Sequence, residues 1–349
     1  MNGTGAARQG TTGGTTGGTG LGHEEARRRK GDLLALAREL ESTRVRAAGA
    51  EEARPAVAVG LAPRHDGSFG VAVRYRLGLP QVRAVARRLA QEGGSAVDVR
   101  RTGRIRPLAG TVGPRPPVAT ALALGPTDRT RPLRPGISVA HVDVSAGTLG
   151  AFVTVGGALH VLSNYHVLAG SPAAQVGDVV VQPGPADGGT ASRDRIGTLA
   201  ATVPLAPGRT ALVDAAVALL DDPEAVDPTY PVGRITTTAA VLGGEAVGKT
   251  GRTTAVTAGR ITAIELDDVV VGYGEGLGDL AFDDQIEVES TGTGPFSRGG
   301  DSGSLVYTQG GVAVGLLFAG SESGGENGTG LTYVNPIDAV LSALDATLV

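Results

Sequence analysis

The chain has 349 residues, of which 41% are hydrophobic, and it contains no cysteine. The absence of cysteine excludes disulfide bonds, thiolate catalysis and cysteine-ligated zinc. No stretch holds 18 consecutive apolar residues and the N-terminus lacks the layout of a signal peptide, so we expect a cytoplasmic protein with no membrane partner.

The formal net charge of -4 hides an uneven distribution along the chain. Residues 1–136 hold 23 Arg and Lys against 11 Asp and Glu, whereas residues 137–349 hold 8 against 24. Opposite charges of this size indicate that the two halves attract each other, or that each half attracts a different partner.

The first 106 residues divide into a tail and a small α+β unit. Residues 1–22 are rich in Gly and Thr with almost nothing apolar, which predicts a flexible tail. Residues 23–106 are predicted to form a basic accessory domain. Its expected elements are a helix over residues 23–48, strands over 56–61 and 70–76, a helix from Pro80 and a strand over 96–100.

The accessory domain has several candidate roles. Its basic run Arg27–Lys30 fits a solvated helix face better than a binding patch. Its arginines are compatible with a nucleic-acid surface, but Phe69 and Tyr75 are its only aromatic residues, so we do not favour a nucleic-acid partner. A protein partner that acts through this domain to regulate the other half is a further hypothesis.

The remainder of the chain changes from a linker to a β-rich domain. Residues 107–136 carry repeated prolines, which predicts a linker. The candidate strands beyond it cover residues 137–144, 149–155, 158–163, 179–182, 196–203, 215–220, 259–266, 269–271, 285–288, 304–308, 312–318 and 331–334. About twelve strands suit two packed barrels or a large sandwich, and an amphipathic helix follows from Pro336.

Ser302 is the candidate nucleophile. It lies between glycines and directly after Asp301, in a sequence suited to a sharp turn with backbone N–H groups beside the hydroxyl. A serine hydroxyl needs a histidine base and a carboxylate that orients this base. All the histidines precede Ser302, which excludes the chain order of an α/β-hydrolase and favours the order His, Asp, Ser.

His166 and Asp214 are the candidates that complete this order. His166 stands where the apolar run 158–163 breaks into a polar turn, a setting that holds a base at a cleft, whereas His160 lies inside the run and fits a packing role. Asp214 leads the apolar run 215–220, where an unpaired carboxylate is costly. An ordinary turn aspartate is the alternative interpretation.

Over about residues 137–349 these motifs resemble those of the trypsin/chymotrypsin-like serine proteases. Leu162–Val167 is similar to the family's histidine motif, Asp214–Leu219 to its aspartate motif and Gly300–Ser304 to its serine motif. The resemblance implies a mainly β fold of two six-stranded antiparallel β-barrels with a C-terminal helix. It also implies that the catalytic residues His166, Asp214 and Ser302 meet in the cleft between the barrels.

The activity implied by the resemblance is that of a serine endopeptidase, which cleaves a protein or peptide substrate through an acyl-enzyme. The backbone N–H groups of Gly300 and Ser302 are expected to form the oxyanion hole. The alternative is a catalytically silent protease-fold binding module, recruited through the basic N-terminal domain.

The resemblance extends to the substrate site. Val314–Gly320 is similar to the family's substrate-pairing strand, so Phe318, Ala319 and Gly320 are expected to bind substrate. Phe296 matches the base of the primary pocket and favours a small or medium apolar side chain there.

Asp301 needs a partner of positive charge. In family members that are activated by cleavage, the aspartate before the serine pairs with a newly formed N-terminus. Here a side-chain cation is favoured over an amine released by cleavage before Ile137, and the candidates are Arg298, Arg252 and Lys249.

Two further motifs point to no bound group. Val247–Thr254 has a superficial similarity to a phosphate loop but lacks its spacing. A cluster of acidic residues lacks the spacing of an EF-hand and fits a solvated loop better than a calcium site; its members are Asp267, Asp268, Asp279, Asp283 and Asp284. We therefore expect neither a metal nor a cofactor.

Overall fold

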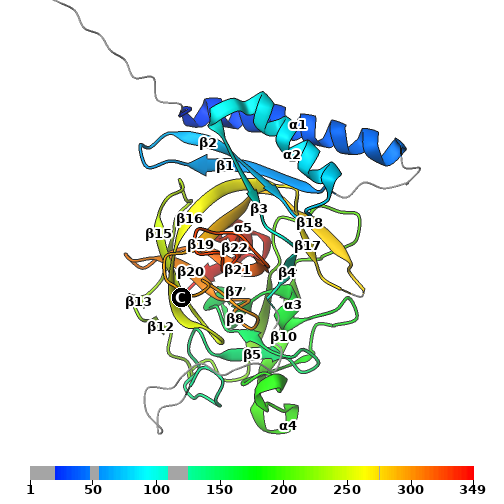
Figure 1. Cartoon of the computed structure of the whole chain (residues 1–349). Coiled ribbons are helices and arrows are strands. Elements are labelled where there is room, and N and C mark those ends of the chain that lie inside the picture. The colour runs from blue at the N-terminus through cyan, green and yellow to red at the C-terminus, as the bar shows by residue number, and fades with distance from the viewer. Residues whose placement is uncertain (1–19, 48–54, 109–124, 275) are drawn as a thin grey trace, which may run out of the picture.

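The computed structural model describes residues 20–47, 55–108, 125–274 and 276–349. Most of the predicted tail and the centre of the predicted linker lie outside these residues. Figure 1 shows a body of strands formed by residues that follow the linker, with a layer of helices and strands from the N-terminal part at one end.

The last third of the chain builds a closed β-barrel. Its strands follow the order β15, β20, β21, β22, β19, β16, and β15 pairs with β16 to close the ring. Alternate side chains point inward along these strands, and Ile261, Val288 and Leu317 belong to the cluster that fills the barrel. The strand bounds are β15 Ala246–Gly251, β16 Ala255–Asp267, β19 Gln285–Ser290, β20 Leu305–Thr308, β21 Val312–Ser321 and β22 Leu331–Pro336.

Another curled sheet, which we call the first barrel because most of its strands precede the closed barrel in sequence, also includes β23 from the C-terminus. Its order is β23, β7, β8, β11, β10, β9, β5, β6. Since β6 leads into β7 and the Leu149 N–H donates to the Ile137 carbonyl at 2.9 Å, the sheet curls back toward its own start. The bounds are β5 Ser138–His141, β6 Gly147–Thr148, β7 Ala151–Val155, β8 Ala158–Ser163, β9 Val179–Val181, β10 Arg195–Thr202, β11 Ala216–Leu220 and β23 Ala346–Leu348.

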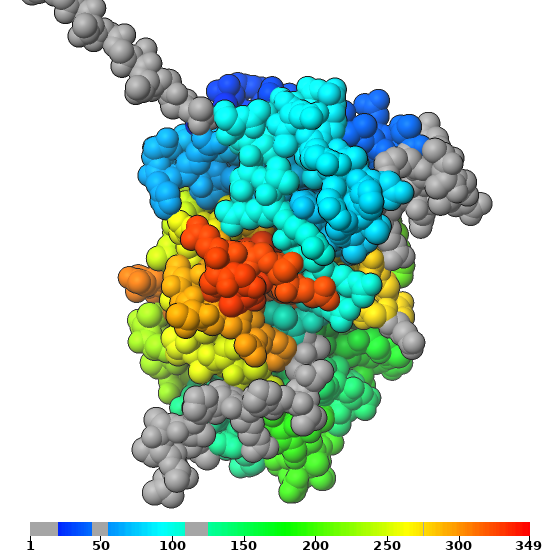
Figure 2. All heavy atoms as spheres, viewed as in Figure 1, coloured from blue at the N-terminus to red at the C-terminus, as the bar shows by residue number. Residues whose placement is uncertain are grey.

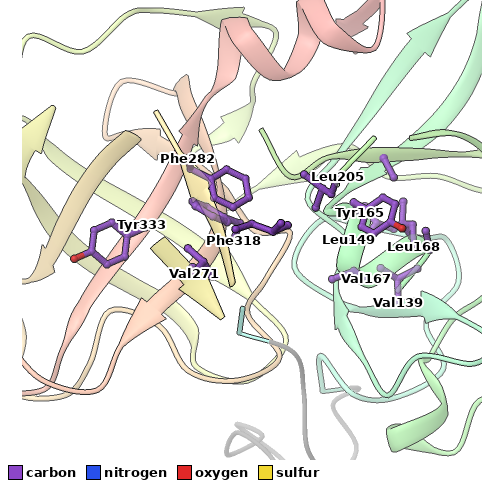
Figure 3. Packing of buried hydrophobic residues seen from close by; sticks show 14 of the residues in the cluster. Val139, Leu149, Tyr165, Val167, Leu168, Leu205, Val271, Phe282, Phe318 and Tyr333 are labelled. Carbon is purple, nitrogen blue, oxygen red and sulfur yellow. The ribbon is translucent and has the colours of Figure 1, made fainter. Parts of the chain in front are cut away.

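A large apolar cluster connects the two barrels. Figure 3 shows Val271, Phe282, Phe318 and Tyr333 on one side of the junction, and a second group on the other side, made of Val139, Leu149, Tyr165, Val167, Leu168 and Leu205. Burial of each large apolar side chain contributes about 1.5–3 kcal/mol. The predicted mainly β fold with two barrels is confirmed, as is the C-terminal helix α5 Ile337–Ala343.

Short elements lie between the barrel strands. The hairpin of β17 and β18 stands between β16 and β19, where the sequence predicted one strand and a solvated acidic loop. β18 was missed because it has only four residues, of which Leu280 and Phe282 are buried. The bounds are α3 Tyr165–Leu168, η2 Pro185–Asp187, α4 Ala191–Asp194, β12 Thr229–Tyr230, β13 Gly233–Arg234, β14 Thr237–Thr238, β17 Val269–Gly272 and β18 Asp279–Phe282.

Residues 57–101 extend the sheet of the closed barrel. β1 (Val57–Pro63) pairs antiparallel with the end of β16, and β2 (Phe69–Tyr75) pairs antiparallel with β1. β3 (Val97–Arg101) pairs parallel with β2, which requires a crossover. The crossover consists of α2 (Pro80–Gly93) and the short 3-10 helix η1 (Gly94–Ala96).

The two N-terminal helices form the outer layer of the molecule. α1 (His23–Ala47) packs against α2 and against β1 and β2. Figures 1 and 2 show both helices covering one end of the molecule. The predicted boundaries of the accessory domain and the linker stay a prediction, because strand pairing does not test whether residues 23–106 fold alone.

Ion pairs join this N-terminal layer to the closed barrel and to the β17–β18 hairpin beside it. On β2, the fully buried Arg74 places Nε 2.8 Å from Oε2 of Glu287, which is also buried. Further pairs across the junction are Arg27–Glu265, Lys30–Asp267, Arg38–Asp268, Arg76–Asp279 and Arg100–Glu289. The opposite charges of the two halves of the sequence therefore meet each other here.

The segment after β3 leaves the N-terminal layer. β4 (Ile105–Pro107) pairs antiparallel with β21, with Arg106 opposite Gly320. The sequence placed these residues at the end of the accessory domain and the start of the linker. A triplet that ends in proline has no strand periodicity of its own, and its extended form is set by the partner strand.

Candidate active site

His166 and Asp214 form a close buried pair. His166 lies in α3, the short helix that follows β8. Asp214 lies just before β11, which pairs with β8. Nδ1 of His166 is 2.5 Å from Oδ2 of Asp214, and the backbone N–H of His166 donates to Oδ1 at 3.2 Å. The two contacts fix the imidazole in one orientation, so that Nδ1 faces the carboxylate.

Asp214 has hydrogen-bond partners besides His166. The Tyr273 hydroxyl donates to Oδ2 at 2.5 Å, and desolvation together with the Asp214 charge raises the pKa of Tyr273 well above its ordinary value. The hydroxyl therefore keeps the proton that it donates. The backbone N–H of Asp214 donates to Oδ1 of Asn335 at 3.0 Å, and its carbonyl accepts a hydrogen bond from Nδ2 of Asn164 at 2.7 Å.

Tyr273 was missed by sequence reasoning. It lies in a glycine-rich segment, 272–278, which predicts a flexible loop. No local pattern indicates its contact with Asp214, which is 59 positions away in the chain.

Ser302 lies where the two barrels meet. Its carbonyl accepts the N–H of Thr148 from the first barrel at 2.8 Å, and its hydroxyl donates to the Phe318 carbonyl of β21 at 3.1 Å. Nε2 of His166 is buried and has no hydrogen-bond partner among the described residues. In this structure, therefore, the Ser302 hydroxyl makes no hydrogen bond to Nε2 of His166.

Gly300 has the backbone conformation that directs its N–H toward Leu108. Its φ of +98° is in the region that favours glycine, and a Cβ atom there would lie 2.3 Å from Oγ1 of Thr253. In this conformation the Gly300 N–H donates to the carbonyl oxygen of Leu108 at 2.5 Å. The donor predicted for an oxyanion thus already binds a peptide carbonyl of the same chain.

Asp301 is satisfied inside the intact chain. Nζ of Lys249 is 3.5 Å from its Oδ2, and both side chains are fully buried. Backbone N–H groups of Thr253, Thr254 and Arg298 donate to the carboxylate at 2.8, 3.1 and 2.9 Å. Burial lowers the pKa of Lys249, and the Asp301 charge opposes that shift.

Lys249 is therefore the cation beside Asp301 among the three candidates. Arg252 pairs with Asp187 instead, and Arg298 contributes its backbone rather than its guanidinium. The Asp301 carboxylate is therefore fully hydrogen-bonded in the intact chain, and it does not need an amine released by cleavage before Ile137.

The predicted substrate residues lie along β21 and beneath it. Phe318, Ala319 and Gly320 are consecutive on this strand, and their backbone faces β4 and Leu108. Phe296 is buried in the apolar cluster of the closed barrel, and Leu108 packs against the same cluster. A cleft of about 830 Å³ is lined by His166, Tyr273 and Pro107 of β4, among others.

The fold is identified by its two barrels: His166 and Asp214 lie on the curled first barrel, and Ser302 lies on the closed barrel. The chain has the fold of the trypsin-like serine proteases. In this trypsin-like fold the predicted residues His166 and Asp214 come into contact. Ser302 and Gly300 stand at the same junction.

Several solved structures of proteases are similar to this chain. Thermobifida fusca protease A is 23% identical with a TM-score of 0.44, over 62% of this chain and 99% of that chain. A glutamic acid specific serine protease is 23% identical with a TM-score of 0.44, over 62% and 100%. The chymotrypsin of Cellulomonas bogoriensis is 20% identical with a TM-score of 0.41, over 62% and 99%. No family model matches the sequence, and no curated protein matches it.

The described part of the chain contains no cluster of three or more His, Cys, Asp or Glu side chains arranged to hold a metal ion. None of the helices within the described ranges is long and apolar enough to cross a membrane.

Proposed function

We propose that the protein is a serine endopeptidase that uses Ser302, His166 and Asp214. The observation that carries the proposal is the buried Asp214–His166 pair, in which Nδ1 is bound at 2.5 Å and Nε2 is left without a partner in the described residues. An imidazole oriented by a carboxylate on one nitrogen and open on the other is the arrangement that a serine base requires.

The groups around the pair supply the remaining parts of the mechanism. His166 takes the proton of Ser302 as the hydroxyl attacks a peptide carbonyl, and Asp214 stabilises the resulting imidazolium. The N–H groups of Gly300 and Ser302 bind the oxygen that becomes negative, an effect of roughly 3–4 kcal/mol per donor. His166 then protonates the leaving amine, and water releases the acyl group.

The substrate class follows from β21 and the pocket below it. An extended peptide would add to β21 by backbone hydrogen bonds at Phe318 and Gly320. Phe296 and its apolar neighbours favour an apolar side chain before the cleaved bond, which agrees with the packing of Leu108 against this cluster. The proposed substrates are proteins or peptides with a residue such as leucine at that position.

A fluorophosphonate probe tests the assignment of the nucleophile. Labelling is expected in the wild type and absent in Ser302→Ala, while hydrolysis of a leucyl peptide substrate falls roughly a million-fold. Ser342→Ala, which changes an exposed serine on α5, should be labelled as the wild type.

Labelling that persists in Ser302→Ala would contradict the assignment. Absence of labelling in every protein that retains Ser302, including the Leu108→Asp variant described below, would instead favour the catalytically silent binding module.

A further inference from the structure

The chain lays its own backbone along the predicted substrate strand. Beyond the β4–β21 pairs, the Glu322 N–H donates to the Arg104 carbonyl at 3.1 Å and the Ser323 N–H to the Thr102 carbonyl at 3.0 Å. The pairing is antiparallel and in one register from Arg104 to Leu108, and the bond to Thr102 lies beyond a bend at Gly103, whose φ is +71°. This is the way in which an extended peptide adds to the edge of a sheet.

Leu108 lies at the end of this pairing. It makes three contacts that are expected of the substrate residue before a cleaved bond. Its N–H donates to the Phe318 carbonyl at 3.2 Å, and its carbonyl oxygen accepts the Gly300 N–H at 2.5 Å. Its side chain packs against the cluster that contains Phe296. Its methyl groups also border Gly320, where an added Cβ would lie 2.9 Å from Cδ2.

The residues before Leu108 fill the adjoining positions. Pro107 lines the same cleft as His166 and Tyr273. Ile105 is 3% exposed and belongs to the apolar cluster between the barrels, whereas Arg106 points to solvent. Alternating buried and exposed side chains are expected of a strand seated in a groove rather than of one lying on a surface.

We infer that the chain is its own first substrate and that the bond between Leu108 and Ala109 is cleaved by Ser302. The inference rests on the proposed endopeptidase function. The Ser302 oxygen bonds to the Leu108 carbonyl carbon while its proton passes to His166, and the carbonyl electron pair moves onto the oxygen at Gly300. The carbon–nitrogen bond then breaks, the nitrogen of Ala109 takes the proton from His166, and a water molecule hydrolyses the ester to leave a Leu108 carboxylate.

The product remains bound after this cleavage. Residues up to Leu108 are attached to the remainder by the β1–β16 ladder, by the β4–β21 ladder and by the buried Arg74–Glu287 pair. These contacts do not involve the cleaved bond, so they keep the Leu108 carboxylate at a high local concentration in the groove. The severed N-terminal part is therefore an inhibitor of the protease that released it.

Intact mass measurement of the full-length protein after purification tests the inference. The wild type is expected to give two chains, residues 1–108 and 109–349, that elute together in size exclusion. Ser302→Ala is expected to stay a single chain. In Leu108→Asp, cleavage after residue 108 should fall at least about 100-fold, because the pocket would have to bury an unpaired carboxylate. Leu242→Asp alters an exposed leucine and should be cleaved as the wild type.

The labelling rate separates this inference from the proposed function. Leu108→Asp should be labelled by the fluorophosphonate at least about tenfold faster than the wild type, because its segment leaves the groove. A wild type that is labelled but remains a single chain would overturn self-cleavage and leave the proposed function standing. Cleavage whose rate rises with protein concentration would overturn the intramolecular step.

Discussion

At the scale of single residues, the site is held together by contacts beyond those of the three proposed catalytic residues. Asp214 receives a hydrogen bond from Tyr273 as well as from His166. Both donors approach Oδ2, so the carboxylate is oriented from two sides. We therefore expect Tyr273 to be a positioning residue, which acts on the histidine through Asp214.

Tyr273→Phe is expected to lower kcat about tenfold with little change in KM. The variant keeps the ring but removes a hydrogen bond to a charged group, which is worth about 1.5–3 kcal/mol. Steady-state hydrolysis of a leucyl peptide measures the effect. Tyr307→Phe loses a hydroxyl contact with Thr250 and serves as the control, with kcat expected to match the wild type. Equal losses in the two variants would contradict the positioning role.

At the scale of elements, β21 has two functions at once. It is a strand of the closed barrel between β20 and β22, and its outer backbone groups bind β4. Gly320 allows the second function, because its missing side chain leaves room for that of Leu108. Under the proposed function, we expect the absence of a side chain at Gly320 to determine which residue fits before the cleaved bond.

Gly320→Val is expected to reduce hydrolysis of leucyl substrates at least about tenfold and that of alanyl substrates less, because the added methyl groups occupy the space of a leucine side chain. The ratio of kcat/KM for the two substrates measures this. Gly310→Val, in the exposed turn between β20 and β21, should leave the ratio unchanged. Equal losses for both substrates would indicate a misfolded strand rather than a narrowed pocket.

The sequence predicted those features of the site that depend on neighbouring residues in the chain. His166, Asp214 and Ser302 each stand at a strand end with a distinctive neighbourhood, and their order along the chain left few alternatives. Tyr273 and β4 could not be predicted in this way. The role of Tyr273 depends on a partner 59 positions away, and β4 is extended only because β21 lies beside it.

At the scale of the whole molecule, the uneven charge of the sequence forms a junction. Its centre is the Arg74–Glu287 pair, in which both side chains are buried and the carboxylate also accepts the Thr262 hydroxyl at 2.9 Å. Such a pair contributes little when compared with apolar residues, but breaking it leaves a buried charge. The junction therefore specifies how the N-terminal layer docks.

Arg74→Met is expected to lower the free energy of unfolding by about 3–5 kcal/mol, because Glu287 would remain buried without its cation. Combining it with Glu287→Leu should recover a large part of the loss. Thermal or denaturant unfolding of the Ser302→Ala protein, which stays a single chain, measures both variants. Arg87→Met changes an exposed arginine of α2 and is the control. A double variant no more stable than Arg74→Met would contradict the coupling.

The pairing of β1 with the end of β16 has a consequence for the protein that remains once the first 108 residues dissociate. Residues 264–267 of β16 would then become an open strand edge, which readily recruits strands of other molecules and leads to aggregation. Glu265 and Asp267 lie on this edge, and Glu287 and Glu289 lie on the neighbouring strand. The carboxylates that bind the N-terminal layer before dissociation would repel other copies afterwards. If the proposed cleavage occurs, the charges that hold the N-terminal part in place would then also protect residues 109–349 from aggregation.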